Sequence, residues 1–175
     1  MWNGAKATLR KPGPVFVARF LAALAVFYVV ISLEAVDARV VVPFTALIVR
    51  TAAVMLHAIH EPIEVAGTVI RTSSFALDVR NGCNGVEAML FVAAAMLAFP
   101  ATLRARLLGL AVVMAAIQLL NLMRVSSLVW LGEHHRNVFD VVHVAVWQTA
   151  VILAAVSMFI YWSVRFGKTS LRARR

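Results

Sequence analysis

The chain has 175 residues, of which 62% are hydrophobic and only 14% are charged, and its mean hydropathy is +0.87. Soluble domains are roughly half apolar and a quarter charged, so most of this chain is expected to lie in lipid. The formal net charge of +9 does not indicate a nucleic-acid partner, because the basic residues flank apolar runs and form no patch with aromatic side chains. A single cysteine excludes an internal disulfide and a cysteine-rich metal site, and no cofactor is expected.

The N-terminal region predicts a membrane anchor. Residues 1–14 are basic and form a short tail. The apolar run at 15–33 contains one charged residue, Arg19, which is placed to snorkel to the near surface. No small-residue cleavage site follows Leu33, so we expect an uncleaved first spanning helix and not a signal peptide.

The segment 40–59 allows two interpretations. It is long enough to cross a bilayer, which takes about 20 residues. However, Arg50 lies near its middle and His57 and His60 follow, and a charge at the bilayer centre costs roughly 2.5–3.5 kcal/mol on insertion scales. We therefore expect an amphipathic helix in the membrane interface, with a spanning helix as the alternative.

The middle of the chain, 61–81, is polar and mixed. Two stretches rich in β-branched residues, 67–71 and 75–79, predict a small hairpin over the membrane surface. Three apolar runs follow, separated by short polar loops, and each is predicted to be a spanning helix. These runs are 86–99, 107–131 and 139–164.

Positive charge predicts the topology. The N-terminal tail, the loop with Arg104 and Arg106, and the basic tail at 165–175 are expected on the cytoplasmic side. Two cytoplasmic ends require an even number of spans, which four spans satisfy if 40–59 does not cross. The predicted fold class is therefore all-α. It is a polytopic membrane bundle at 15–164, with about four spanning helices, an amphipathic interfacial helix and a small extracytoplasmic segment.

The only cysteine lies in the stretch Asn-Gly-Cys-Asn-Gly-Val-Glu at 81–87. A structural cysteine is usually buried among large apolar side chains, whereas here small and polar residues surround Cys83. Gly82 and Gly85 leave the thiol open to another molecule, and Asn81 and Asn84 supply hydrogen-bonding groups. The setting indicates a thiol that meets a substrate.

Two ionisable residues are predicted near the level of Cys83, at the outer mouth of the helix that begins at 86. At 1.5 Å per residue, Arg124 lies about 10 Å below the outer end of its span and His143 about 6 Å below the same surface. Ionisable residues within a membrane usually face a cavity or a partner. A thiol, an imidazole and a guanidinium are the groups that acyl transfer needs: a nucleophile, a proton carrier and a stabiliser of the oxyanion.

Supporting residues follow from helical spacing. Asn121 precedes Arg124 by three residues and shares its face. Asp140 precedes His143 by three residues and is placed to orient the imidazole ring, as the third group of a triad does. Glu87 follows the cysteine by four residues and is placed to pair with Arg124 or with a substrate.

Each of these residues also has a structural interpretation. Cys83 would then be a small apolar residue, Arg124 a snorkelling anchor and His143 a histidine satisfied in the core. Under that interpretation the chain is a non-catalytic membrane scaffold or transporter subunit. A further alternative is a lipid-directed membrane acyltransferase with the cysteine as acyl carrier. A metal site at His134 and His135 lacks enough nearby ligands.

The order and spacing of these motifs resemble the exosortase/archaeosortase family. The stretch 81–87 and the apolar helix up to Pro100 are similar to the cysteine motif of that family. Asn-Leu-Met-Arg-Val at 121–125 resembles its arginine motif, and Phe-Asp-Val-Val-His at 139–143 its histidine motif. The resemblance covers roughly 43–161 and looks most like the small exosortase H group. The family often has Ser where this chain has Asn84, which we interpret as a variation within the subgroup.

The resemblance implies an integral-membrane cysteine peptidase or transpeptidase of the cell inner membrane. Members of the family act on exported proteins that end in a short motif, a transmembrane helix and a basic cluster. Cys83 would be the nucleophile, Arg124 would stabilise the oxyanion or substrate, and His143 would be the general acid and base. The implied partners are membrane lipids, the exported substrate proteins and an acceptor that the sequence does not identify.

Overall fold

The computed structural model describes residues 13–172, with side chains as far as Phe166. The predicted basic tails, 1–14 and 165–175, therefore lie outside the described residues only at 1–12 and at 173–175. The helical elements in this range are α1 (Pro14–Ile31), α2 (Glu34–Val36), the π-helix η1 (Asp37–Val41), α3 (Val42–His57), α4 (Val86–Ala98), α5 (Leu103–His134), the 3-10 helix η2 (Arg136–Val138), the π-helix η3 (Val141–Trp147) and α6 (Gln148–Arg172).

Local sequence explains several helix ends. Pro14 occupies the first turn of α1, where its missing N–H has no intrahelical partner to lose. Pro100 lies between α4 and α5, because it cannot continue a helix. Thr102 caps α5, since its Oγ1 accepts a hydrogen bond from the Ala105 backbone N–H at 3.3 Å. At the other end of the chain α6 continues to Arg172, so the predicted helix end at residue 164 is too early.

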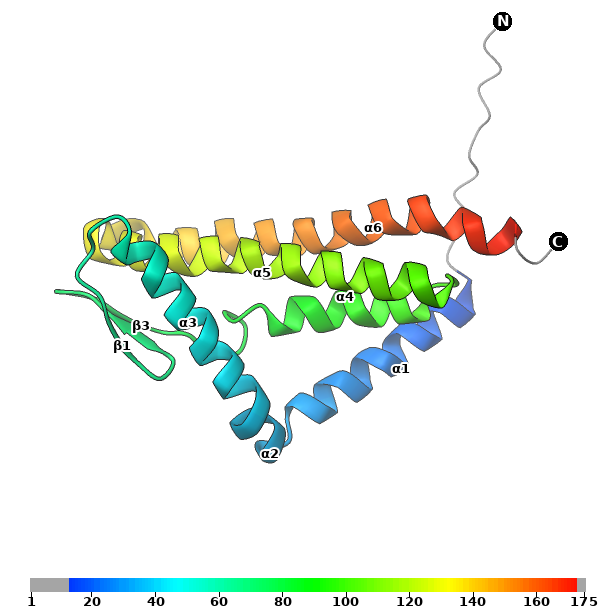
Figure 1. Ribbon diagram of the computed structural model, residues 1–175, viewed down its shortest axis with the longest axis horizontal. Coiled ribbons are helices and arrows are strands. Elements are labelled where there is room, and N and C mark those ends of the chain that lie inside the picture. Colours follow the sequence, from blue (N-terminus) through cyan, green and yellow to red (C-terminus); the bar gives the residue numbers. More distant parts are fainter. Residues whose placement is uncertain (1–12, 173–175) are drawn as a thin grey trace, which may run out of the picture.

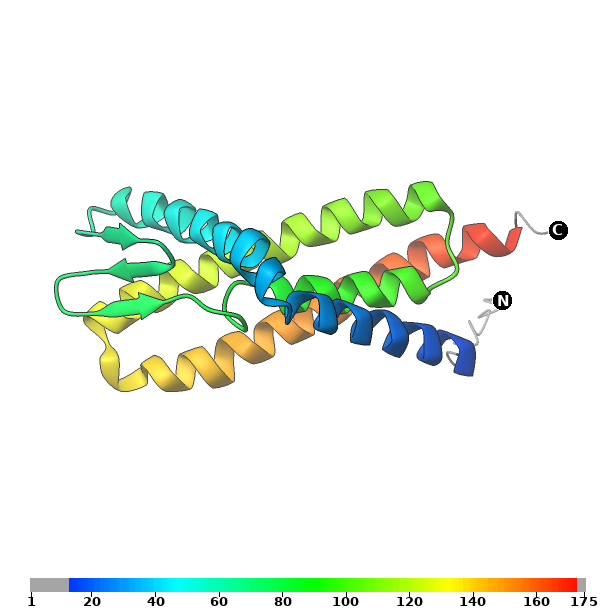
Figure 2. The same cartoon turned by 90° about the horizontal axis from the view of Figure 1, so that it is seen from below.

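The helices form an elongated bundle. Figures 1 and 2 show that α4, α5 and α6 run along the long axis, and that α5 and α6 extend over most of its length. In contrast, α1 and α3 are each shorter than α5 and α6, meet at α2 and lie one after the other along this axis. Helix α1 packs on α4, and α3 packs on the half of α5 nearer to the sheet. The start of α1 and the end of α6 lie at one end of the bundle, and the sheet lies at the other.

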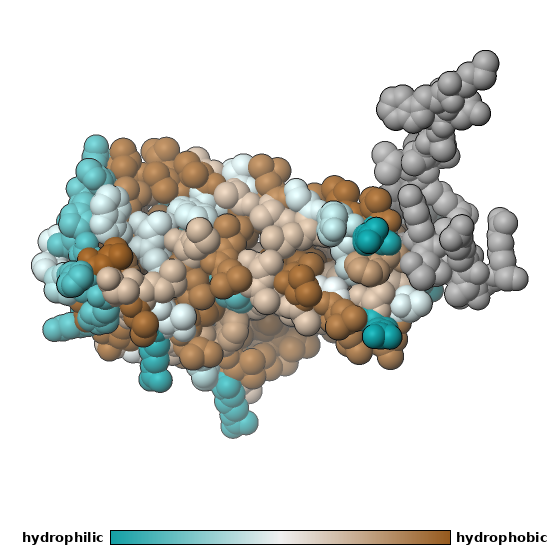
Figure 3. Space-filling view, turned by 45° about the horizontal axis from the view of Figure 1, so that its top comes forward, coloured by the Kyte–Doolittle hydropathy of each residue, from teal (hydrophilic) through white to brown (hydrophobic). Residues whose placement is uncertain are grey.

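The prediction of an all-α polytopic membrane bundle is confirmed. Within the described residues, four helices are long and apolar enough to cross a membrane: 14–31, 34–57, 103–134 and 141–166. The surface agrees, because hydrophobic residues cover most of the face in Figure 3 and hydrophilic residues gather at the sheet end. An apolar surface of this extent is expected of a protein that contacts lipid.

The set of long helices differs from the prediction in two places. First, α2, η1 and α3 join into one helical segment of 24 residues, so 40–59 belongs to a helix of spanning length. The sequence did not predict that the helix begins before Val40, because the charges of Asp37 and Arg39 interrupt the apolar run there. Second, the predicted span at 86–99 forms α4, which has only 13 residues and is about 20 Å long, shorter than the roughly 30 Å hydrocarbon core.

A small antiparallel sheet connects α3 to α4. Its strands are β1 (Glu64–Ala66), β2 (Val69–Arg71) and β3 (Ala76–Asp78), in the order β1-β2-β3. The predicted hairpin at 67–71 and 75–79 corresponds to β2 and β3, and β1 was not predicted. Gly67 has a φ of +62° in the two-residue turn between β1 and β2, a conformation that favours glycine.

Two apolar clusters hold these elements together. One lies between α3, α5 and the sheet and includes Val49, Ala52 and Ile70, each with 0% exposure. The other joins α4, α5 and α6 around Met96 and Trp162. The turn that carries the cysteine lies between these clusters in the chain, after β3 and before α4, so both ends of the turn are attached to packed elements.

Candidate active site

The turn from Arg80 to Gly85 presents the only cysteine. The Cys83 backbone N–H donates to the Arg80 carbonyl at 2.8 Å, and Gly82 and Gly85 have positive φ angles of +86° and +77°. A Cβ on Gly85 would lie only 3.0 Å from the Gln118 side chain. Gly85 is therefore required by its conformation and by its close packing against α5.

Asn84 attaches this turn to α3. Its side chain has 0% exposure, and its Nδ2 donates to Thr45 Oγ1 and to Asn81 Oδ1, both at 3.0 Å. Its Oδ1 accepts from the Val86 backbone N–H at 3.0 Å, at the start of α4. Because one amide joins α3, the turn and α4, Asn84 fixes the position of Cys83; the hydrogen bonds of its side chain within the described residues go to Thr45, Asn81 and Val86 and not to the sulfur.

His143 reaches the thiol from the beginning of the last helical segment. Its Nε2 lies 3.0 Å from Cys83 Sγ, although the two residues are 60 positions apart in the chain. His143 lies in the π-helix η3, a helix type that is frequent at functional sites. Its ring also packs against Phe139, with ring centroids 5.6 Å apart.

Arg124 approaches the same sulfur from α5. Its Nη2 donates to Cys83 Sγ at 3.5 Å and to Gln148 Oε1 at 3.4 Å, and its Nη1 donates to the Gly82 carbonyl at 3.2 Å. The side chain has only 3% exposure. No ion pair involves Arg124 among the described residues, so a buried positive charge stands next to the thiol without a carboxylate. Negative charge that develops on the sulfur would compensate it.

The electrostatics of Cys83 combine opposing effects. Burial raises the pKa of the Cys83 thiol above its usual range, the nearby Arg124 charge lowers it, and the Glu87 carboxylate raises it. Burial outweighs the arginine, so the thiol is neutral at rest. A thiolate would therefore form only if a base removed the proton, and the imidazole of His143 is the basic group in contact with the sulfur.

The predicted supporting residues have other contacts than expected. Glu87 does not pair with Arg124; its Oε1 accepts from the Gly82 backbone N–H at 2.7 Å and so holds the cysteine turn. Asp140 has no hydrogen bond or ion pair to His143 among the described residues, and its carboxylate acts on the imidazole through its charge alone. Asn121 is fully buried behind the turn, against Gly85.

Three polar residues at the site were not among the predicted site residues. Gln148 accepts from Arg124, Thr45 accepts from Asn84, and Gln118 Nε2 donates to the Asn84 carbonyl at 3.2 Å. Each is a polar residue within an apolar helix, which is the signal that sequence reasoning could have used. The described residues contain no group of three or more His, Cys, Asp and Glu that could hold a metal ion.

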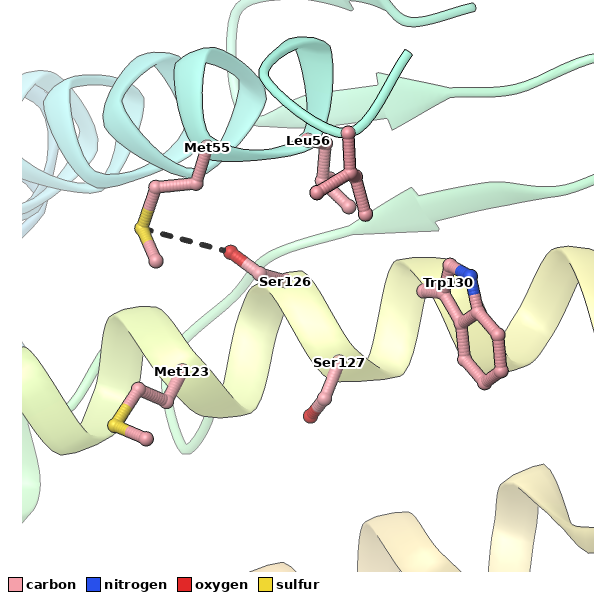
Figure 4. A pocket seen from close by; sticks show the side chains of 7 residues that line it. Met55, Leu56, Met123, Ser126, Ser127 and Trp130 are labelled. Atoms are coloured by element: carbon pink, nitrogen blue, oxygen red, sulfur yellow. Dashed lines mark hydrogen bonds between the residues drawn. The ribbon is translucent and has the colours of Figure 1, made fainter. Parts of the chain in front are cut away.

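Two hollows lie near these helices. An open polar cleft of about 490 Å³ runs beside the cysteine turn and is lined by residues that include Asp37, Thr45, Asp78 and Asn81. An apolar groove of about 400 Å³ lies between α3 and α5 (Figure 4), where Ser126 and Trp130 are two of its lining residues. The lining of the groove includes none of the cysteine, histidine and arginine of the site, so the groove is separate from the thiol.

Comparison with known proteins gave one finding. The family model described as Transmembrane exosortase (Exosortase_EpsH) matches residues 9–163. The match contains Cys83, Arg124 and His143 and all of the helices except the end of α6. No curated protein and no solved structure matches the chain.

Proposed function

The chain belongs to the transmembrane exosortase family, and on that basis we propose that it is an integral-membrane cysteine peptidase or transpeptidase. It cleaves the C-terminal sorting signals of exported proteins, which consist of a short motif, a transmembrane helix and a basic cluster. It transfers the remaining protein to an acceptor. The observation that carries this proposal is the 3.0 Å contact of Cys83 Sγ with His143 Nε2, beside the buried guanidinium of Arg124.

In the first half of the reaction His143 Nε2 takes the proton of the Cys83 thiol. The thiolate attacks the scissile carbonyl carbon, a C–S bond forms and the carbonyl oxygen becomes an oxyanion. The intermediate then collapses, the C–N bond breaks, and the imidazolium returns its proton to the departing amine. The products of this half are a thioester on Cys83 and a free sorting tail.

In the second half an acceptor amine or water attacks the thioester carbonyl. His143 takes a proton from the attacking group and gives it to the sulfur as the C–S bond breaks, so the thiol is restored. Arg124 acts in both halves, because its buried charge lies where negative charge forms on the sulfur and on the adjacent oxyanion. Asn84 and Glu87 hold the turn so that the sulfur stays in line with the imidazole.

We also propose that the protein lies in the cell inner membrane with both termini in the cytoplasm and the site on the extracytoplasmic side. The charges support this orientation, because Arg104, Arg106 and Arg165 lie at the end of the bundle where α1 begins and α6 ends. Cys83 immediately precedes α4, whose 13 residues extend about 20 Å to that basic end. This distance supports a position of the sulfur in the outer leaflet.

The test is the loss of processing in the Cys83→Ala variant. An epitope-tagged exported protein from the same cell, ending in a motif, an apolar helix and a basic cluster, is expressed with each variant and its size is followed. The tagged protein is expected to remain uncleaved with Cys83→Ala. It is expected to be cleaved normally with Ser126→Ala, whose hydroxyl donates to Met55 Sδ at 3.9 Å and lies in the groove that is separate from the thiol. Normal cleavage by Cys83→Ala at equal membrane levels would refute the cysteine mechanism.

A further inference from the structure

The outer edge of the sheet leads directly to the cysteine turn. Within residues 13–172 the strand order is β1-β2-β3, so β3 has a neighbouring strand on one side only. Ala76 and Asp78 of β3 are both exposed. The chain then passes from Asp78 through the buried Val79 into the turn that holds Cys83. The free edge and the thiol therefore belong to one continuous segment.

The register identifies which backbone groups of β3 are free. The Thr72 N–H donates to the Phe75 carbonyl at 2.8 Å, and the Val79 N–H donates to the Thr68 carbonyl at 3.0 Å. Antiparallel pairs alternate between bonded and non-bonded residues, so residues 75, 77 and 79 bond to β2. Ala76 and Asp78 consequently direct their N–H and C=O groups away from the sheet.

The free edge also lies on the side of the histidine. Figure 2 shows β3 as the strand nearest to the beginning of the last helical segment, where η3 carries His143. Contacts agree with this arrangement, because Phe75 packs on Phe139 with ring centroids 5.1 Å apart. The other outer strand, β1, packs against α3 and leads away from the cysteine.

We propose that the polypeptide substrate binds as an added strand on the free edge of β3, which delivers its scissile carbonyl to Cys83. This inference rests on the proposed function, because only a peptide substrate can form such pairing. Strand addition uses main-chain hydrogen bonds for affinity, and it holds the peptide extended. An extended peptide exposes the carbonyl that a helix would engage in its own hydrogen bonds. The unpaired groups of Ala76 and Asp78 are the donors and acceptors for this pairing.

If the edge of β3 has only a structural role, a different result is expected from changing it. Charged side chains on an edge strand prevent pairing with other chains, and Asp78 forms an ion pair with the exposed Arg80 at 2.6 Å. If the edge only avoids association, removing its outward N–H would leave cleavage unchanged. If the edge binds substrate, the same change would weaken binding.

The matched variants are Ala76→Pro and Val65→Pro, each of which removes one outward N–H from an outer strand. Ile70 bonds to β3 in this register, so its partner Val65 on β1 directs its own groups outward. Cleavage of the tagged tail-bearing protein by Ala76→Pro is expected to fall about tenfold or more, through loss of a hydrogen bond and obstruction by the ring. Cleavage by Val65→Pro is expected to stay at the wild-type level. Equal cleavage by both variants would overturn the proposal.

A second measurement separates this proposal from the catalytic one and from misfolding. In the Cys83→Ala background, a cysteine replaces Ala76 and single cysteines are placed along the substrate motif. Disulfide formation is expected at every second substrate position, because successive side chains of a strand point to opposite faces. A helical repeat or an absence of cross-links would overturn strand addition. The proposed function fails separately, if Cys83→Ala still cleaves the substrate.

Discussion

Arg124 and Glu87 should move the ionisation of Cys83 in opposite directions. The Arg124 guanidinium lies 3.5 Å from the sulfur and favours the thiolate, whereas the Glu87 carboxylate opposes it. Replacing the arginine by glutamine removes a charge but keeps a hydrogen-bond donor. We therefore expect Arg124→Gln to raise the pKa of the Cys83 thiol and Glu87→Gln to lower it.

The distance between Arg124 and the sulfur gives the expected size of the change in the pKa of Cys83. Two unit charges about 4 Å apart interact by about 4 kcal/mol at an effective dielectric constant of 20 and by about 1 kcal/mol in water. One pKa unit corresponds to about 1.4 kcal/mol, and Cys83 is only half-buried, so the expected increase for Arg124→Gln is about one to two units. The decrease for Glu87→Gln should be smaller, because its carboxylate is the weakest of the three influences on this thiol.

The assay uses the fact that the chain has one cysteine. Alkylation by iodoacetamide therefore reports only Cys83, and its rate rises with pH until the thiol is fully ionised. At a pH below the pKa, Arg124→Gln should be alkylated about tenfold more slowly for each unit of increase. If both variants shift the midpoint in the same direction, or if neither shifts it, the two charges do not control the ionisation of Cys83.

Substitutions at two more positions test the contacts around the site. Asn84→Ala leaves Thr45 and the backbone at the start of α4 without their partner, so the free energy of unfolding should fall by about 1–3 kcal/mol. The midpoint of thermal unfolding in detergent should be lower for Asn84→Ala than for the wild type, and intermediate for Asn84→Ser. An unchanged midpoint would contradict the stabilising role of Asn84. Gln148→Glu gives Arg124 a carboxylate partner and should slow alkylation of Cys83, whereas Gln148→Ala should change the rate little. Equal rates would contradict that role.

The meeting of Cys83, Arg124 and His143 could be anticipated because helix geometry converts sequence position into depth. Each residue lies near the same end of its own apolar run, and 1.5 Å per residue places all three near one level. Rotation about each helix axis is not fixed by depth. The contacts at 3.0 and 3.5 Å depend on how α5 and η3 pack around the turn, which a single sequence does not specify.

The contacts of Asp140 and Gln148 could not be predicted from the sequence, because they depend on an irregular helix. A regular helix would place Asp140 beside His143 at i+3, but η3 is a π-helix and its hydrogen bonds join residues five apart. Gln148 follows His143 by five positions, and it is this residue that completes the contacts of Arg124. The composition of residues 141–147 does not predict a π-helix.

The partners of the cysteine turn that lie far away in the chain could not be predicted from local sequence patterns either. Thr45 lies 39 positions before Asn84, in a segment that was expected to lie on the membrane interface. The buried pairing becomes evident only when α3 is packed against α5 and the sheet. Similarly, β1 is three residues long and has no alternation of its own, so its pairing with β2 could not be recognised in the sequence.

Mass spectrometry of the enzyme during turnover of the tagged tail-bearing protein tests directly whether Cys83 is the nucleophile. A covalent adduct is expected on the peptide that contains Cys83, with the mass of the substrate without its tail. Hydroxylamine should release this adduct, because it is a thioester, and Cys83→Ala should not form it. Cleavage that proceeds with no adduct in the wild-type enzyme, or with an adduct on another residue, would show that Cys83 is not the nucleophile.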